Sequence, residues 1–122
     1  MKKILSTVFI FIAVANSALA VDIDVNYYWS NPRCVTCKKM ETYTKSAVQK
    51  MNDSEVHFKM IEASKAPQDV KDYGLYTKSV VLVKNTDGKK EWKNLDKIWN
   101  NLRNQESFEN YIITEVSKFK GE

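Results

Sequence analysis

The 122-residue chain has two cysteines, Cys34 and Cys37, and they are separated by Val35 and Thr36. Two thiols at this spacing can form and break a short disulfide by thiol–disulfide exchange. A structural staple usually closes a longer loop, because the chain-entropy estimate for a loop of about four residues is only roughly 2 kcal/mol before ring strain is subtracted. We therefore interpret Cys34 and Cys37 as a redox-active disulfide pair.

The local context of the pair also favours reactivity. The pair follows a predicted strand and opens a predicted helix, and the unpaired N–H groups at a helix N-terminus stabilise an anion. A thiol in that position has a lowered pKa, and its thiolate is the reactive form. Arg33 and Lys38 add positive charge on the two sides of the pair. We predict that Cys34 is the attacking nucleophile and that Cys37, one turn into the helix, is the resolving thiol.

Other uses of two cysteines were compared with redox chemistry. Haem attachment requires a histidine directly after the second cysteine, where this chain has Lys38. A structural zinc site requires four ligands, and the one histidine, His57, lies at a polar position of a predicted strand, so we predict no metal site and no cofactor. Copper(I) remains an alternative, because two thiolates and the soft sulfur of Met40 could bind it, although Met40 also lies on the apolar face of its helix. A non-catalytic domain with an inert disulfide is the other alternative.

The pattern of apolar residues predicts the elements that position the pair. Val21 to Trp29 alternate between apolar and polar residues, which is typical of a strand. The expected order is strand, helix, strand, helix, strand, strand, helix, helix, which predicts an α/β domain with a mixed sheet of about four strands flanked by helices. The expected ranges are 21–29, 34–51, 56–60, 67–73, 79–84, 89–92, 95–102 and a last helix that Asn104 caps and that includes 108–119.

The N-terminus has the features of an export signal. Two lysines precede the apolar stretch 4–15, which has the length of a signal-peptide core and is shorter than the roughly 20 residues of a membrane-spanning helix. The sequence Ala-Leu-Ala that ends at Ala20 fits a cleavage site. We predict a signal peptide over 1–20 and an exported domain over 21–122, periplasmic or secreted, where a disulfide can persist. An uncleaved membrane anchor is the alternative.

The charge of the chain gives no sign of a nucleic-acid partner. The formal net charge is +4, and it falls to +2 without the signal segment, which holds two lysines and no acid. The other lysines alternate with acids and form no basic stripe, so we predict no nucleic-acid partner and membrane contact only through the signal segment. The expected partners are protein or small-molecule thiols and disulfides, with a membrane-bound redox protein as one candidate.

The order of elements, with Cys-x-x-Cys at the start of the first helix, resembles the thioredoxin superfamily over Val21 to Phe119. Tyr73-Gly74-Leu75, leading into 80–85, resembles the thioredoxin segment that enters the central hairpin. More narrowly, the Arg-Cys-x-x-Cys segment, the Tyr-Thr-Lys-Ser stretch and the Trp-rich C-terminal region resemble small exported thioredoxin-like proteins of the nitrophenyl compound nitroreductase subunit ArsF type. The resemblance implies thiol–disulfide oxidoreductase activity. Nothing in the sequence resembles a flavin site, so nitroreduction is not predicted.

The chain departs from the thioredoxin pattern at two places. Lys78-Ser79 stands where the superfamily has a cis-proline, and a non-proline cis bond costs about 2.5–4 kcal/mol, so we expect a trans bond and a different substrate groove. Lys78 would place a cation near the thiols, or else it is a solvent-facing loop residue. Tyr28 stands where thioredoxins have a buried aspartate. Glu41, one turn after Cys37, is then the candidate for proton transfer, and a solvated helix glutamate is the alternative.

The aromatic residues have packing roles as their first interpretation. Tyr27 and Trp29 lie on the first predicted strand, and we expect them to pack in the core. We expect Trp92 and Trp99 to fix the C-terminal helices onto the sheet. A surface for a partner protein is the alternative role of these side chains.

Overall fold

The computed structural model describes residues 21–30, 35–75, 78–86 and 88–121, so the predicted signal peptide, Arg33 and Cys34 lie outside the described residues. Among the described residues, no helix has both the length and the apolar character needed to cross a membrane. The elements, in chain order, are β1 (Asp22–Trp29), α2 (Val35–Met51), β2 (Val56–Glu62), η1 (Ala63–Lys65), α3 (Pro67–Tyr73), β3 (Ser79–Thr86), β4 (Lys89–Asn94), η2 (Asp96–Asn101) and α4 (Gln105–Phe119).

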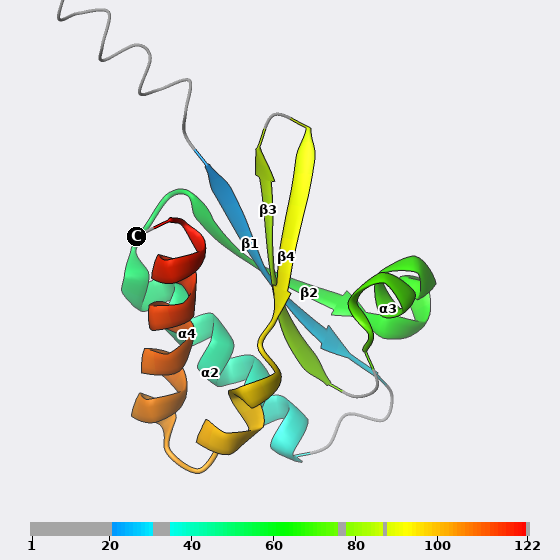
Figure 1. Ribbon diagram of the computed structural model, residues 1–122. Coiled ribbons are helices and arrows are strands. Elements are labelled where there is room, and N and C mark those ends of the chain that lie inside the picture. Colours follow the sequence, from blue (N-terminus) through cyan, green and yellow to red (C-terminus); the bar gives the residue numbers. More distant parts are fainter. Residues whose placement is uncertain (1–20, 31–34, 76–77, 87, 122) are drawn as a thin grey trace, which may run out of the picture.

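The four strands form one mixed sheet in the order β2-β1-β3-β4. β1 pairs with β2 in parallel and with β3 antiparallel, and β3 and β4 form an antiparallel hairpin. Figure 1 shows α2 and α4 on one face of the sheet and α3 on the other. This arrangement confirms the predicted mixed four-strand sheet flanked by helices.

The main core lies between the sheet and the pair α2 and α4. The alternation of β1 directs every second side chain to this face, and α2 and α4 each contribute an apolar stripe. Met40, which the sequence predicts on the apolar face of its helix, is fully buried, and so is Ala47. The buried residues of this core include Ile23, Val25, Tyr27, Val80, Leu82, Ile98, Phe108, Ile112 and Val116.

A second and smaller core lies under α3, on the opposite face of the sheet. Its buried members are Tyr28, Tyr73, Leu75, Val81 and Val83. Because β1 and β3 are the two central strands, side chains on both of their faces are covered. The continuous apolar run in β3 is therefore buried on both sides, as predicted for a central strand.

Local capping residues explain where α3 begins and ends and where α4 begins, and the predicted cap at Asn104 is confirmed. Pro67 occupies the first turn of α3, and Gly74 closes that helix in the left-handed conformation with φ 64°. The Asn104 side chain accepts a hydrogen bond from the Ser107 backbone N–H at 2.9 Å and caps α4.

The prediction that Trp92 and Trp99 fix the C-terminal helices onto the sheet is wrong. Trp92 pairs in register with Val83, which faces α3, so its ring lies 5.0 Å from that of Tyr73 and is 45% exposed. Residues 96–101 form a 3₁₀ helix, in which positions three apart share a face. Ile98 is therefore buried, whereas Trp99 is turned outward and is 39% exposed.

The contact between α2 and α4 includes one buried carboxylate, which makes stability depend on pH. Glu109 is 1% exposed and its Oε1 accepts a hydrogen bond from Lys50 Nζ at 2.5 Å. Burial alone would raise the pKa of Glu109, but the donors of Lys50, Ser46 and Gln105 outweigh burial and hold the pKa below its ordinary value of 4.5. The unfolded chain therefore binds this proton more readily than the folded chain does.

We expect the free energy of unfolding to fall as the pH drops below about 4.5, because protonation of Glu109 favours the unfolded state. In Glu109→Gln the fall should be shallower, although Asp53 also has a lowered pKa, through its hydrogen bond from Lys120, and keeps part of the slope. Urea unfolding between pH 6 and pH 3 measures how the free energy of unfolding changes with pH in Glu109→Gln and in the unaltered protein. Glu106→Gln, at an exposed position of the same helix, is the control. Equal slopes in Glu109→Gln and the unaltered protein would contradict the assignment.

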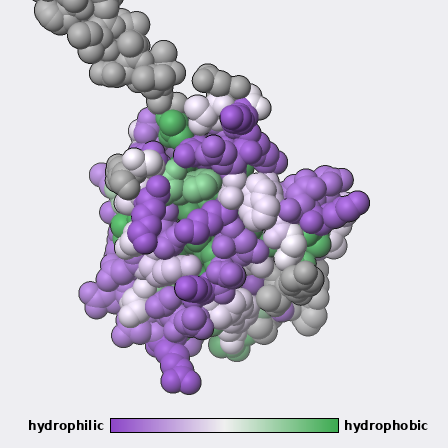
Figure 2. Space-filling view, in the orientation of Figure 1, coloured by the Kyte–Doolittle hydropathy of each residue, from purple (hydrophilic) through white to green (hydrophobic). Residues whose placement is uncertain are grey.

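Hydrophilic residues cover most of the face seen in Figure 2, and hydrophobic residues show there only in small separate patches. Lysines and acids are interspersed in the sequence, and several of them form exposed pairs, such as Lys59 with Asp24.

Candidate functional site

The described part of the predicted redox segment is the first turn of α2. Cys37 is the third residue of this helix and is 1% exposed, whereas Val35, two residues earlier, is 80% exposed. The first turn contains no acidic residue, so nothing there offsets the positive end of the helix dipole. Lys38 is exposed beside it. Cys34 and Arg33 lie outside the described residues, so the predicted Cys34–Cys37 disulfide stays a prediction.

Tyr27 holds the first turn of α2 against the sheet. Its hydroxyl donates a hydrogen bond to the backbone carbonyl of Cys37 at 2.9 Å, and both residues are buried. The strand alternation explains this contact, because Tyr27 shares the face of β1 that α2 covers. Tyr27 therefore packs in the core, as predicted. Its hydrogen bond also holds the backbone of Cys37 against β1.

Glu41 lies one turn after Cys37 on the same helix, where side chains four residues apart are neighbours. Its side chain is partly buried, and its Oε1 is shielded from solvent. Glu41 is therefore not a fully solvated helix glutamate. A role for Glu41 in proton transfer stays a prediction.

Tyr28, at the position of the thioredoxin aspartate, points to the opposite face of the sheet from Tyr27. Its hydroxyl donates to Asp69 Oδ2 of α3 at 2.8 Å and accepts from Asn26 Nδ2 at 3.3 Å. Burial, followed by donation to Asp69, raises the pKa of Tyr28 well above its usual range. Tyr28 is therefore a neutral hydrogen-bond donor at neutral pH, and the carboxylate of this region comes from Asp69. No sequence pattern indicates this partner, which follows Pro67 in the first turn of a short helix.

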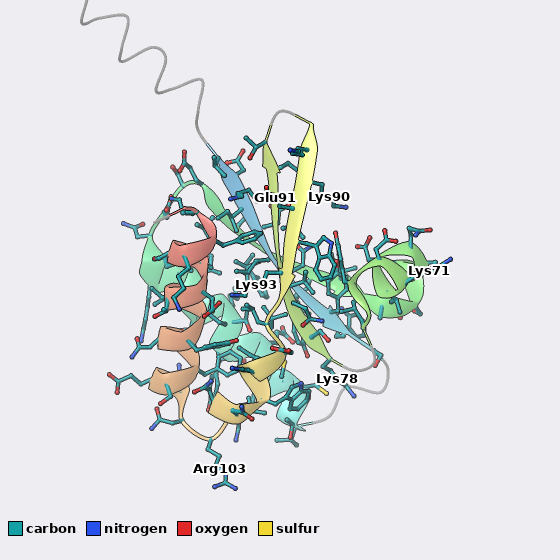
Figure 3. All side chains as sticks on the ribbon, viewed as in Figure 1. Lys71, Lys78, Lys90, Glu91, Lys93 and Arg103 are labelled. Atoms are coloured by element: carbon teal, nitrogen blue, oxygen red, sulfur yellow. The ribbon has the colours of Figure 1, made fainter. Side chains whose placement is uncertain are left out.

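Lys78 and Ser79 lie at the end of the sheet where β1 ends and β3 begins. Ser79 pairs in register with Tyr28, and Figure 3 shows Lys78, the residue before β3, at this end of the sheet. Ser79 is buried, and Lys78 is partly buried. Lys78 lines a pocket of about 170 Å³ together with Trp29 and Ser30, the last residues before the redox segment. Lys78 is therefore a pocket wall and not a fully solvated loop residue.

The residues considered for metal binding are not gathered in the described structure. Among residues 21–30, 35–75, 78–86 and 88–121, no group of three or more His, Cys, Asp and Glu side chains could hold an ion. His57 is an exposed strand residue whose Nε2 lies 3.4 Å from Asp22 Oδ1. Met40 is fully buried in the main core, which agrees with the packing interpretation of its helix position.

Solved structures share the arrangement of these elements. The chain is similar to the Trx4 domain of ERdj5, with a TM-score of 0.56 and 14% sequence identity over 80% of this chain and 82% of that domain. The chain has a thioredoxin-like fold. It also matches two crystal forms of ERdj5, over 80% of this chain and 12% of the longer protein, with TM-scores of 0.56 and 0.50 and identities of 11% and 13%.

These structural similarities show the fold of the chain. Its activity has to be inferred from its own residues. No protein-family model matches the sequence, and no curated protein matches it. Within the thioredoxin-like fold, Lys78-Ser79 stands at the start of β3, where the superfamily resemblance gives a cis-proline. Tyr28 stands near the end of β1, at the position where thioredoxins have an aspartate.

Proposed function

We propose that this protein is an exported thiol–disulfide oxidoreductase, in which Cys34 and Cys37 form the redox pair and protein or small-molecule thiols and disulfides are the partners. The observation that carries the proposal is the position of Cys37. It is buried in the first turn of a 17-residue helix that begins beside the end of the central strand β1, within a thioredoxin-like fold. A resolving thiol needs such a sheltered position, and an attacking thiol three residues earlier in the sequence would be closer to the exposed end.

In the proposed reaction, the Cys34 thiolate attacks one sulfur of a partner disulfide. This forms a mixed disulfide and releases the first partner thiolate, which takes a proton from solvent. The Cys37 thiolate then attacks the Cys34 sulfur, which closes the Cys34–Cys37 disulfide and releases the second partner thiolate. Two electrons pass from the protein to the partner, and the reverse sequence oxidises a partner dithiol.

The charges around the first turn of α2 support a reactive thiol. The N-terminus of α2 has no acidic residue in its first turn, and Lys38 is exposed beside it. Together with Arg33 in the sequence, these groups favour a thiolate and would lower the thiol pKa. A lower thiol pKa stabilises the reduced form and favours the oxidant direction, while a membrane-bound reductant would drive the opposite direction.

Export through the signal segment is part of the proposal. β1 begins at Asp22, so cleavage after Ala20 would remove none of the described strands or helices. The product would be periplasmic or secreted. The narrower resemblance to small exported proteins of the ArsF type belongs to the same proposal and supports export and the Cys-x-x-Cys site, without nitroreduction.

A redox titration of the protein, purified after export, tests the proposal. The protein is equilibrated with dithiothreitol and oxidised glutathione at graded ratios, and its free thiols are counted. We expect one reversible two-electron transition at a potential above about −300 mV. A pair that is never reduced would contradict the proposal and indicate an inert disulfide. Stoichiometric copper binding by the reduced protein without exchange activity would indicate a metal carrier.

A further inference from the structure

The pocket at the end of β1 is lined in part by residues that precede the proposed redox segment in the sequence. It is formed where β1, α3 and the start of β3 meet, and its walls include Trp29 and Ser30 of the β1 end, Val70 of α3, Leu75 and Lys78. Ser30 is four residues before Cys34 in the sequence. A polypeptide whose disulfide reacts with Cys34 would therefore have its neighbouring residues within reach of this pocket.

The size and walls of the pocket suit one apolar side chain. Its volume is about 170 Å³, which equals roughly five or six water molecules at 30 Å³ each, and this is too small for a whole tripeptide thiol. Val70 and Leu75, which belong to the smaller core under α3, present apolar surface. The Tyr28 hydroxyl, from another lining residue, donates its hydrogen bond to Asp69 and is therefore not available as a donor inside the pocket.

Lys78 gives the pocket a positive charge that the described residues do not balance. Within the described ranges, no hydrogen bond or ion pair joins Lys78 to another side chain. The nearby carboxylates have partners: Asp69 accepts the Tyr28 hydroxyl, and Glu62 lies 3.6 Å from Lys65 Nζ. A partly buried cation without a counter-charge attracts an anionic group of a partner.

We propose that this pocket is a specificity subsite for polypeptide partners in which the reacting disulfide has a large apolar residue and an acidic residue beside it. The apolar side chain enters the pocket, and the carboxylate pairs with Lys78. The inference rests on the proposed thiol–disulfide exchange and names its substrate class. Lys78 acts here as a specificity-determining residue.

Exchange with a set of short peptides tests the subsite. Each peptide has one disulfide flanked on both sides by Leu-Glu, Leu-Gln, Leu-Lys or Ala-Glu, and the second-order rate constant of its reduction by the reduced protein is measured. We expect the Leu-Glu peptide to react about fivefold faster than the Leu-Lys peptide at low ionic strength, with the ratio decreasing as salt is added. The Leu-Glu peptide should also react faster than the Ala-Glu peptide.

Variants assign the two preferences to the pocket. In Lys78→Gln the Leu-Glu to Leu-Lys ratio should fall to near one, and in Ala63→Leu, which fills the pocket, the Leu-Glu to Ala-Glu ratio should fall. Lys71→Gln, on the outer side of α3 (Figure 3), removes an equal charge elsewhere and should keep both ratios. Each ratio is taken within one variant, so any change in thiol reactivity cancels.

The outcomes separate the subsite from the proposed function. Rates that change equally for all peptides in Lys78→Gln, with unchanged ratios, would overturn the subsite and indicate that Lys78 tunes the thiols. Exchange without preference in the unaltered protein would overturn the subsite alone. No exchange with any peptide or with neutral hydroxyethyl disulfide would overturn both proposals.

Discussion

Replacing Cys34 by serine should abolish thiol–disulfide exchange, with a rate loss of about three orders of magnitude or more, because the attacking thiolate is removed. Cys37→Ser should behave differently. Its Cys34 can still attack a partner disulfide, but no resolving thiol follows, so the mixed disulfide should accumulate. The measurement is the exchange rate of each variant, together with non-reducing electrophoresis and mass spectrometry of the trapped adduct.

The burial of Cys37 requires controls for folding in this experiment. Because Cys37 is 1% exposed, a serine hydroxyl there is buried and costs stability, so Cys37→Ala serves as an apolar second variant and should trap the same adduct. Thr42→Ser, at an exposed position of α2, is a control for serine substitution in the same helix. Full exchange by a folded Cys37→Ser, with no adduct, would contradict the resolving role of Cys37.

Much of the fold follows from local sequence signals. The alternation of β1 and the continuous apolar run of β3 predicted two strands, and their burial patterns agree with a central position in the sheet. Gly74 and Asn104 marked helix ends, since a left-handed C-cap and a side-chain N-cap each need particular residue types. These features depend on residues that are neighbours in the sequence, so they can be predicted from one amino-acid sequence.

The faces of the sheet were harder to assign. Alternation shows which residues of a strand share a face, but not which helix covers that face. The sequence pattern predicts that Trp92 contacts the C-terminal helices, whereas its pairing with Val83 places it on the α3 face beside Tyr73. A helix with a period of 3.6 predicts Trp99 on an apolar stripe, whereas the 3₁₀ geometry of η2 turns it outward.

The same limit applies to the candidate site. The Cys-x-x-Cys pair and the position of Lys78 can be read from the sequence. The hydrogen bond from Tyr28 to Asp69 joins residues 41 positions apart, and no periodicity or motif links them. The pocket at Lys78 is formed by residues of β1, η1 and α3 and of the segment before β3, which meet only in the folded chain. Groups that act through contacts between distant parts of the sequence can therefore be identified only in the folded structure.

Replacing Phe108 by alanine should lower the free energy of unfolding by about 3–5 kcal/mol, which is a large part of the stability of a typical domain. Phe108 of α4 is fully buried, and its ring packs edge-on against Tyr43 of α2, with the centroids 5.5 Å apart. The substitution removes apolar contacts and leaves a cavity between the two helices. Urea unfolding measures the loss, and Phe108→Leu, which keeps most of the volume, should lose less.

This substitution also tests whether α2 opens with the rest of the domain. Tyr43 lies less than two turns after Cys37 in α2, and Tyr27 ties Cys37 to the central strand, so α2 should unfold together with the sheet. In a Cys34→Ser background, alkylation of Cys37 should then rise about 10²–10⁴-fold in Phe108→Ala, as a loss of about 3–5 kcal/mol in global stability requires. A much smaller rise, with the full loss of stability, would show that Cys37 becomes accessible by local opening of the first turn. In that case the Tyr27 hydrogen bond would not couple the start of α2 to the sheet.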